Sequence, residues 1–557
     1  MIDSQPNVQP SVDVAPQARG AILAAVLLAL FLSSLDQTVV GTALPRIVTD
    51  LHGNELYTWV VTAYLLASTI TVPIYGKFSD VFGRKPMLLI GVVVFLVGSA
   101  LSGLSQSMIQ LVAFRALQGL GAGALFPVSL AIIGDLFSPR ERGRYQGLFG
   151  AVFGLSFILG PFIGGVLTDN ASWRWVFYVN LPVGVVALAV ITVVLPNVRR
   201  GASVRDLDYL GIVLFTVGVI PLLVGLTNKG QTDSSGHLYG WVSPQVGLLL
   251  LIAAVFLTLF LLVERRAREP IIPLDLFRDR SYAATNVATF LVAVAMFAAV
   301  IYLPRYYQAV RGVSATQSGY EIWPLLVGLI GGSIASGLLI SRTGKYKVIL
   351  LSAMVSLIVG NLLMTRLTAQ TDSVVLWSWM LLIGLGVGPA MAGYTVVVQS
   401  IVPRDRLGVA TSTLTFLRQI GGSVGLALAG TVFTSTFASD LPGKLVAASV
   451  PARVATRIAN QFGGNLTGVG GIGKQVGASL PPQFQALVPH IVTGIHDAVA
   501  SAVASLFWLG AGAGTLALVT ALFIREVPLR GTVSAPEATE REAEVAGPAR
   551  TEPEPAQ

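Results

Sequence analysis

The chain has 557 residues, of which 54% are hydrophobic and only 11% charged, and its mean hydropathy is +0.74. These values exclude an ordinary water-soluble protein, and the absence of cysteine excludes disulfides, thiolate nucleophiles and cysteine-ligated metals. The formal charge of +8 requires no nucleic-acid partner, because the positive residues lie in short segments between apolar blocks, as they do in membrane proteins.

The apolar blocks are long enough to cross roughly 30 Å of hydrocarbon, so each predicts a transmembrane helix. No cleavable signal is expected before them, since residues 1–19 are polar and predict a cytoplasmic N-terminal segment. Lysine and arginine are concentrated in alternate connections, which predicts that both termini lie in the cytoplasm. Fourteen spans are expected, at 20–44, 57–76, 87–105, 109–133, 145–168, 175–195, 209–227, 245–263, 282–303, 317–340, 347–366, 374–400, 407–437 and 500–524.

The first span contains Asp36, the only carboxylate well inside any predicted span. An ionisable group at that depth costs about 3 kcal/mol on insertion scales, so a functional role is the default interpretation. Whether such a carboxylate carries a proton depends on its burial and on nearby cations, which a change of conformation can alter. We expect Asp36 to couple transport to protons and its neighbour Gln37 to contact substrate. The alternative is a structural carboxylate paired permanently with an arginine.

A short charged connection follows the second span. Its Asp80 can dock on a helix N-terminus, where the helix dipole favours negative charge, and Arg84 can pair with Asp135 on the same side of the membrane. Such contacts would latch one group of helices to another. A basic connection that only orients the protein is the plainer interpretation, but it does not explain Asp80. We expect Gly76 and Gly83 to take part in the same latch, which would act as a conformational switch.

Two arginines lie inside later spans. Arg115, in the fourth span, can neutralise Asp36 or hold a water near it, and the glycines that follow it permit a close neighbouring helix. Arg418, beside Gln419 in the thirteenth span, has a similar setting, and we expect this pair to contact substrate. For each arginine the alternative is a static ion pair that only supports the fold.

The fifth span carries four glycines and a proline within residues 154–165. Glycine costs a soluble helix about 1 kcal/mol and proline about 3 kcal/mol, so the pattern requires an explanation. In a membrane, small residues let two helix backbones approach closely, and proline bends the helix. We expect the motif to shape this span where two helical bundles rock against each other; an ordinary packing seam is the alternative. The residues concerned are Gly160, Pro161, Gly164 and Gly165.

Glu321 begins the tenth predicted span between two aromatic residues, Tyr320 and Trp323. A carboxylate beside aromatic rings can attract a cationic, aromatic ligand through its charge and through the ring faces. We therefore include these three residues among the expected substrate contacts. A solvated glutamate near the outer interface is an equally good interpretation.

The connection 438–499 is longer than a turn requires and is rich in glycine, alanine and proline. It is expected on the outer side, with a short amphipathic helix at 450–462 lying on the membrane surface or over an outer opening. Residues 468–475 approach a phosphate-binding loop but lack its hydroxyl residue and a preceding strand, which excludes a nucleotide site. The tail 526–557 is rich in proline, glutamate and alanine and is expected to be disordered.

Together these motifs resemble those of the major facilitator superfamily, and in particular its fourteen-span drug:proton antiporters of the EmrB/QacA type. The Asp80 connection is similar to the motif between the second and third spans of that superfamily. It recurs weakly at 337–347, where Ser341 stands in place of the aspartate, so an asymmetric latch is expected. The other similar stretches are Asp36 with 43–45, then 115–123, 154–165, 173–182 and 270–278.

The resemblance implies an all-α membrane protein with the major facilitator fold and 14 transmembrane helices. It implies an N-terminal six-helix bundle at 20–200, two inserted helices at 205–265 and a C-terminal six-helix bundle at 280–525, around a central site served by alternating access. It further implies a proton-coupled multidrug efflux antiporter of the bacterial plasma membrane, exporting amphipathic, often cationic compounds. No cofactor or metal would be needed. The partners would be the substrate, protons and the bilayer, with no nucleic acid, and the protein would be a monomer.

Other functions stay open at this point. A dedicated exporter of a lipid or secreted metabolite is the main alternative, and the connection 438–499 would suit it if that segment covered a lateral opening. A receptor or scaffold that kept the fold and lost transport is a third possibility, against which Asp36, Arg115 and the 154–165 motif argue. An enzyme is not expected, because no nucleophile–base pair or metal cluster is apparent.

Overall fold

The computed structural model describes residues 16–52, 56–196, 207–229, 239–462, 482–527 and 529. Within these ranges the chain is helical, with one isolated bridge between Leu207 and Glu269 outside the helices. Fourteen of the described helical segments are long and apolar enough to cross a membrane, as the sequence predicted. The tail 530–557 and the phosphate-loop-like stretch 468–475 lie outside the described residues.

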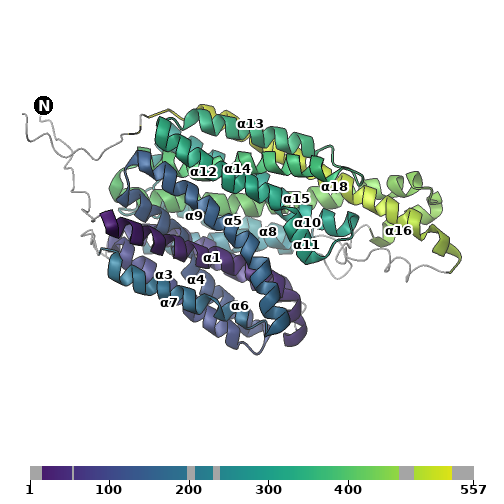
Figure 1. Ribbon diagram of the computed structural model, residues 1–557, viewed down its shortest axis with the longest axis horizontal. Helices are drawn as coiled ribbons and strands as arrows, with labels where there is room; N and C mark the ends of the chain where they lie inside the picture. Colours follow the sequence, from purple (N-terminus) through teal and green to yellow (C-terminus); the bar gives the residue numbers. More distant parts are fainter. Residues whose placement is uncertain are drawn as a thin grey trace, which may run out of the picture.

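The first six spans pack together as one bundle, drawn in purple to blue (Figure 1). Small residues set its helix separations: a Cβ at Gly98 of the third span would lie 2.5 Å from the Gln118 backbone of the fourth, so only glycine fits there. The sixth span is broken at Val179. The helices are α1 (Pro16–Leu51), α2 (Tyr57–Phe82), α3 (Arg84–Leu104), α4 (Met108–Leu136), α5 (Pro139–Asn170), α6 (Trp175–Tyr178) and α7 (Asn180–Val194).

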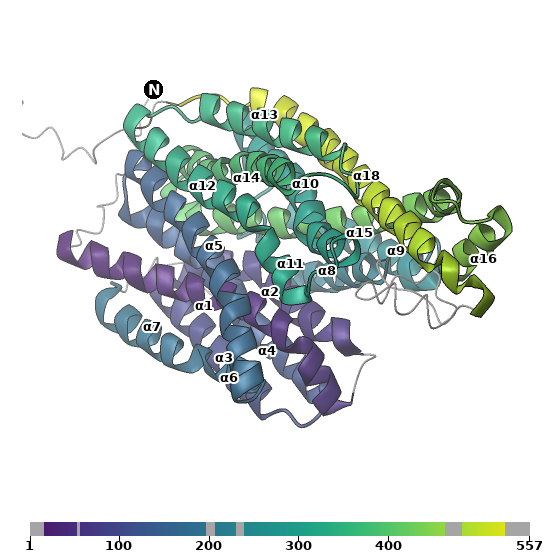
Figure 2. The same cartoon turned by 45° about the vertical axis from the view of Figure 1, so that its right-hand side comes forward.

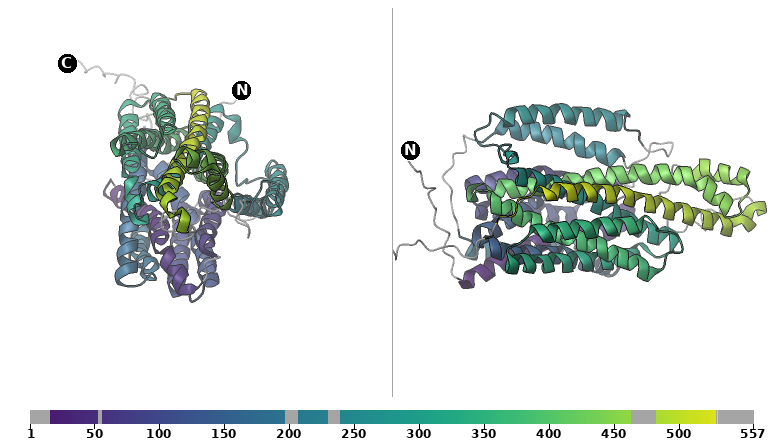
Figure 3. Two further views of the ribbon diagram at one scale, coloured as in Figure 1. Left: turned by 90° about the vertical axis from the view of Figure 1, so that its right-hand side faces the viewer. Right: turned by 90° about the horizontal axis from the view of Figure 1, so that it is seen from above.

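Two further spans stand beside the bundles as an antiparallel pair, which the right-hand view of Figure 3 separates clearly from the rest. They are α8 (Tyr209–Lys229) and α9 (Leu249–Glu264), the latter preceded by the π-helical turn η3 (Pro244–Leu248). Phe215 of α8 packs on Phe416 of the second bundle, with ring centroids 5.1 Å apart. Only 17% of the apolar window of this span is buried inside the protein, so in a membrane much of α9 would contact lipid.

The last six spans form the second bundle, in teal to yellow in Figure 1. The tenth span starts later than predicted, because Pro324 begins a new helix and the preceding residues form a separate short one. The helices are α10 (Arg280–Val310), α11 (Ala315–Glu321), α12 (Trp323–Thr343), α13 (Lys347–Met364), α14 (Ser373–Ile401), α15 (Leu407–Ala447), α16 (Ala452–Phe462) and α18 (Val488–Leu522), with short turns η4 (Leu276–Arg278), η5 (Arg404–Arg406) and η6 (Pro482–Leu487).

The C-terminal end of α15 and the N-terminal end of α18 correct the predicted limits of the connection 438–499. Both helices continue far past the predicted limits, and with α16 they project beyond the rest of the bundle (Figure 1). The helix expected at 450–462 is present as α16, but its apolar residues Ala455 and Ile458 are buried within the second-bundle core. Protein packing therefore covers the apolar face that was expected on the membrane surface or over an outer opening.

The two bundles approach each other at the end of the molecule where α1 begins and α18 ends, called the terminal end below. Figure 2 shows their helices diverging toward the opposite end. Near the terminal end, Gly143 and Gly147 of α5 face the α12 backbone so closely that a Cβ at either position would lie 2.9 Å from a carbonyl oxygen of that helix. The bundle interface is thus closed at the terminal end.

Candidate functional site

Asp36 is fully buried inside the first bundle and accepts hydrogen bonds from three side chains on two helices, α4 and α7. Its Oδ2 atom accepts from Arg115 at 2.6 Å, and its Oδ1 atom accepts from Gln118 at 2.8 Å and from Asn180 at 2.9 Å. The structure therefore contains the pair that the sequence predicted for Asp36 and Arg115, together with two amide donors to which no role had been assigned.

The Arg115 guanidinium is held by more than this ion pair. It lies 4.2 Å from the centre of the Tyr64 ring, and its Nε atom donates to the Val60 carbonyl at 3.3 Å. Asn180 also donates to Ser99 at 3.0 Å. The acid and its partners thus connect α1, α2, α3, α4 and α7, and Asp36 faces neither lipid nor the second bundle.

The predicted latch is closed at the terminal end. Asp80 accepts hydrogen bonds from the backbone N–H groups of Gly408, at 3.0 Å, and Val409, at 2.7 Å, which are the first free amides of α15. The dipole at that helix N-terminus favours the carboxylate. Arg84 bridges Asp80 at 2.6 Å and Asp135 at 2.9 Å, so both expected contacts are present. One carboxylate therefore ties α2 of the first bundle to α15 of the second.

Two glycines make that docking possible. A Cβ at Gly76 would lie 1.9 Å from the Ser412 hydroxyl and 2.9 Å from the Gly408 carbonyl, so the approach of α2 to α15 requires glycine. Gly83 has φ +97°, a conformation that side-chain-bearing residues rarely adopt, and it separates α2 from α3.

The second half of the latch uses the opposite charge. At the start of α5, Arg140 donates to the carbonyls of Ser341, at 2.7 Å, and Arg342, at 2.5 Å, at the C-terminal end of α12. A cation at a helix C-terminus is favoured as an anion is at an N-terminus. Because Ser341 stands where an aspartate was expected, the sequence predicted an asymmetric latch. In the structure, a carboxylate (Asp80) accepts from backbone amides in one half, and a guanidinium (Arg140) donates to backbone carbonyls in the other.

Arg142 lies between Arg140 and Arg144 in the sequence, a basic stretch that by itself predicts only a charge that orients the protein. It is instead 2% exposed, and it donates to the carbonyls of Gly134, Phe137 and Gln399, each within 3.0 Å. Gln399 of α14 also donates to the Leu130 carbonyl of α4 at 2.9 Å. These contacts join α4 and α5 to α14, so they add to the closure between bundles.

The glycine motif of the fifth span lies differently from the prediction. Gly160 and Gly164 face Thr38 and Thr42 of α1, within the same bundle, and a Cβ at Gly165 would meet nothing within 4 Å. Of the four glycines in the motif, Gly154 does touch the second bundle, since a Cβ there would lie 2.0 Å from the Ile330 side chain of α12. The other α5 glycines that touch α12 lie earlier along the helix. Spacing identifies a close helix contact, but it does not say which neighbour makes it.

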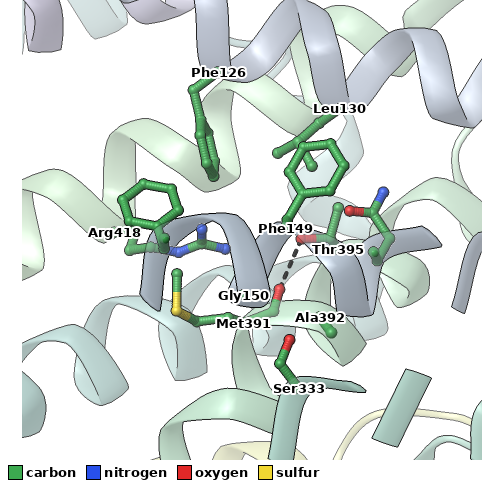
Figure 4. A pocket seen from close by; sticks show the side chains of 11 residues that line it. Phe126, Leu130, Phe149, Gly150, Ser333, Met391, Ala392, Thr395 and Arg418 are labelled. Carbon is green, nitrogen blue, oxygen red and sulfur yellow. Dashed lines mark hydrogen bonds between the residues drawn. The ribbon is translucent and has the colours of Figure 1, made fainter. Parts of the chain in front are cut away.

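A small cavity of about 10 Å³ lies between helices of the two bundles (Figure 4). Helices of both bundles line it, and Arg418 of α15 supplies its one cationic side chain. The lining residues are Phe126, Leu130, Gln146, Phe149, Gly150, Phe153, Ser333, Met391, Ala392, Thr395 and Arg418.

Residues 26–426 match the family model described as Major Facilitator Superfamily. The chain belongs to the major facilitator superfamily. It is 36% identical over 518 residues to the multidrug transporter protein MdtP of Bacillus subtilis, an alignment that covers 92% of this chain and 94% of that protein. It is 35% identical over 523 residues to multidrug resistance protein 3 of the same organism, covering 92% and 96% of the two chains.

The fold agrees with this membership. The solved structure of the human organic anion transporter MFSD10 superposes with a TM-score of 0.56 at 17% identity, covering 90% of this chain and all of that one. This likeness concerns the fold alone. The family and the all-helical, fourteen-span architecture predicted from the sequence are therefore confirmed.

Within this major facilitator protein, the six expected substrate contacts do not form one site. Arg418 lines the cavity between the bundles, and the adjacent Gln419 has a buried Oε1 atom without a hydrogen-bond partner among the described residues. Tyr320 and Trp323 are 41% and 48% exposed, and Trp323 packs edge-to-face on Trp377 at 5.8 Å. The remaining two do not line the cavity either: Glu321 is half-buried beside Trp323, and Gln37 is exposed next to Asp36.

Proposed function

We propose that this protein is a proton-coupled antiporter that exports amphipathic compounds from the cytoplasm across the bacterial plasma membrane, with both termini in the cytoplasm. The observation that carries the proposal is the fully buried Asp36, whose counter-charge, Arg115, comes from a different helix. Such a pair is expensive to bury and easily altered by one proton. The printed names of the two Bacillus relatives, a multidrug transporter and a multidrug resistance protein, support the export of several compounds.

Protonation of Asp36 would remove the negative charge that faces Arg115. The guanidinium would then be buried without its partner, a state that costs several kcal/mol unless the helices rearrange or water enters. The expected response is a shift of α1 against α4 and α7, which carry the other groups of the network. Each proton that crosses inward would contribute about 2.3 kcal/mol per 100 mV to drive this cycle.

The path from the acid to the second bundle would run through α5. On one side of α5, the Ser34 and Ser156 hydroxyls lie 2.6 Å apart, and Thr38 donates to the Ser156 carbonyl at 2.9 Å. On the other side, α5 packs directly on α12. A shift of α1 would therefore move α5, which belongs to the bundle interface. The protonation of Asp36 and the contact between the bundles would then act on the same helix, α5.

The Asp80 and Arg84 latch would hold the cytoplasmic side shut while the opposite side is accessible. Opening that side would break the contacts of Asp80 with α15 and those of Arg140 with α12. In this cycle, protonation supplies the free energy, and the latch sets the ratio of molecules with the cytoplasmic side closed to molecules with that side open.

The test is transport by purified protein in vesicles with an imposed pH gradient, offered cationic, neutral and lipidic amphiphiles. Asp36→Asn keeps the shape of the side chain and removes its titration, so we expect proton-driven transport to fall by about ten-fold or more, with downhill exchange of substrate retained. Asp50→Asn is the matched control, because Asp50 lies on the same helix but pairs with Arg46 at 3.3 Å near the outer end. Full proton-driven transport by the Asp36 variant would remove this acid from the mechanism, and transport of the lipids alone would favour a dedicated lipid exporter.

A further inference from the structure

Arg418 is half-buried, and its contacts differ from those of the other enclosed arginines that the structure describes. Arg115 and Arg84 each bind carboxylates, and Arg142 donates to three backbone carbonyls. The Arg418 Nη2 atom is buried and has no hydrogen-bond partner among the described residues, and none of the described carboxylates pairs with this guanidinium. A charged donor left unpaired in an apolar interior costs free energy, and an anionic ligand that paired with it would recover part of that cost.

The surroundings of Arg418 are apolar and aromatic. Its guanidinium carbon lies 5.9 Å from the centre of the Phe126 ring, and Phe126 packs edge-to-face on Phe153 at 5.5 Å and on Phe149 at 6.2 Å. Figure 4 shows the guanidinium pointing into the cavity, with Met391 on one side of it. A cation in such a setting attracts an anion more strongly than it would in water.

The cavity in this conformation is about the size of one water molecule, yet its walls belong to both bundles. The aromatic wall comes from α4 and α5, and the cation comes from α15. Separation of the bundles would therefore widen the cavity and expose the guanidinium together with the rings. The site would open and close with the same movement that alternates access.

We propose that Arg418 binds an anionic group, a carboxylate or sulfonate, on the transported compound, while the rings of Phe126 and Phe153 hold its apolar body. A guanidinium binds such groups through two parallel hydrogen bonds, which an ammonium cannot match. The inference rests on the proposed function and narrows its substrates to amphiphiles that carry an acidic group. It departs from the expectation of mainly cationic substrates.

The experiment compares two dyes that share one ring system and differ in charge: fluorescein, which is anionic, and a rhodamine ester, which is cationic. Transport is measured in phosphatidylcholine vesicles with an imposed pH gradient, for the wild type, Arg418→Gln, Arg418→Lys and Phe126→Leu. Arg418→Gln should lower fluorescein transport by about ten-fold or more and change rhodamine transport by less than about two-fold. Arg418→Lys should give an intermediate loss for fluorescein only, and Phe126→Leu should lower both dyes alike.

Several results would overturn the inference. Equal loss of both dyes in Arg418→Gln and Arg418→Lys would mean that the cation supports the fold or the coupling, and unchanged fluorescein transport would mean that it does not meet the anion. Dependence on Arg418 that appears only after phosphatidylglycerol is added would identify a lipid headgroup as the anion instead.

Equilibrium binding of each dye to the purified wild type and Arg418→Lys proteins keeps the test decisive if Arg418→Gln does not fold. Weaker binding of fluorescein alone to the lysine variant supports the proposal, and equal binding of both dyes to both proteins contradicts it. A wild type that moves neither dye nor any other amphiphile under a pH gradient would defeat the proposed function itself. A wild type that moves rhodamine but not fluorescein would defeat only the inference about Arg418.

Discussion

Replacing Asp80 with asparagine is expected to open the terminal end of the transporter. The wild-type carboxylate accepts from two backbone amides of α15, at 3.0 and 2.7 Å, and it is the only part of α2 that caps this helix of the other bundle among the described contacts. Asparagine has one acceptor oxygen and no charge. The variant therefore loses one of the two hydrogen bonds and the attraction between the carboxylate and the helix dipole.

The size of the effect follows from these two losses. A hydrogen bond to a charged group contributes about 1.5–3 kcal/mol, and a charge beside a helix terminus contributes about 0.3–1 kcal/mol. Together they amount to about 2–4 kcal/mol in favour of the closed terminal end. Since about 1.4 kcal/mol corresponds to a factor of ten, the ratio of closed to open molecules should fall by about 30-fold to several hundred-fold.

The absence of cysteine makes this shift directly measurable. Arg144 on α5 and Lys345 after α12 are exposed at the terminal end, on opposite bundles. Changing Arg144 and Lys345 to cysteine gives two unique attachment points for spin labels. Double electron–electron resonance spectroscopy then reports the distribution of distances between the two labels. We expect one short distance in the otherwise unaltered protein and a dominant or comparable longer distance when Asp80→Asn is added.

Asp279→Asn is the matched control for this experiment. Asp279 accepts from the amides of Ser281 and Tyr282, at 2.8 and 2.9 Å, at the N-terminus of α10. As at Asp80, a carboxylate meets two amides of a helix N-terminus, but here the Oδ1 atom accepts both hydrogen bonds and all the groups belong to one bundle. This variant should lower thermal stability and leave the label distance unchanged. An unaltered distance distribution in Asp80→Asn, or the same change in both variants, would refute the reasoning.

Two further substitutions test packing and hydrogen bonding. Gly147→Val adds a branched side chain where a Cβ alone would lie 2.9 Å from the Ser333 carbonyl, so transport in vesicles should fall by about ten-fold. Gly165→Val is the control: this position faces open space, so the substitution should change transport by less than about two-fold. Similar transport by the two variants would contradict this explanation. Asn180→Leu removes one donor from Asp36 and should lower the free energy of unfolding by about 1–3 kcal/mol, seen as a lower thermal unfolding temperature in detergent. An unchanged unfolding temperature would show that the amide is not needed by the acid.

Much of the candidate site was visible in the sequence because a membrane penalises polar residues inside apolar blocks. Asp36 and Arg115 were recognisable as a pair on this ground alone, and Asp80 was recognisable because a basic connection has no use for a carboxylate. Arg142 gave no such signal, since an arginine beside Arg140 and Arg144 looks like one more topogenic charge. Its burial depends on α14, which lies far away in the chain and meets α5 only in the folded protein.

The C-terminal end of α15 and the N-terminal end of α18 were mispredicted for a related reason. A span is predicted to end where hydrocarbon ends, and this rule places the limits near residues 437 and 500. The helices continue because their outer residues pack on each other and on α16, with Leu441, Leu445 and Ile491 fully buried there. These helix ends are buried against protein and not in lipid. An apolar run interrupted by polar residues is compatible with both environments, so the sequence pattern does not distinguish them.

The sequence by itself determined that this chain resides in a bilayer, how many spans it has and which few polar groups lie within them. It could do so because bilayer thickness and the cost of burying charge act on each segment separately. Only the tertiary structure decided which helix each polar group or glycine meets. Asp80 caps α15, Gly160 faces α1, and Arg418 lines a cavity between bundles with its Nη2 atom unpaired among the described residues. Those pairings join residues more than a hundred positions apart. They depend on how whole bundles pack, which the composition and spacing of a single segment do not record.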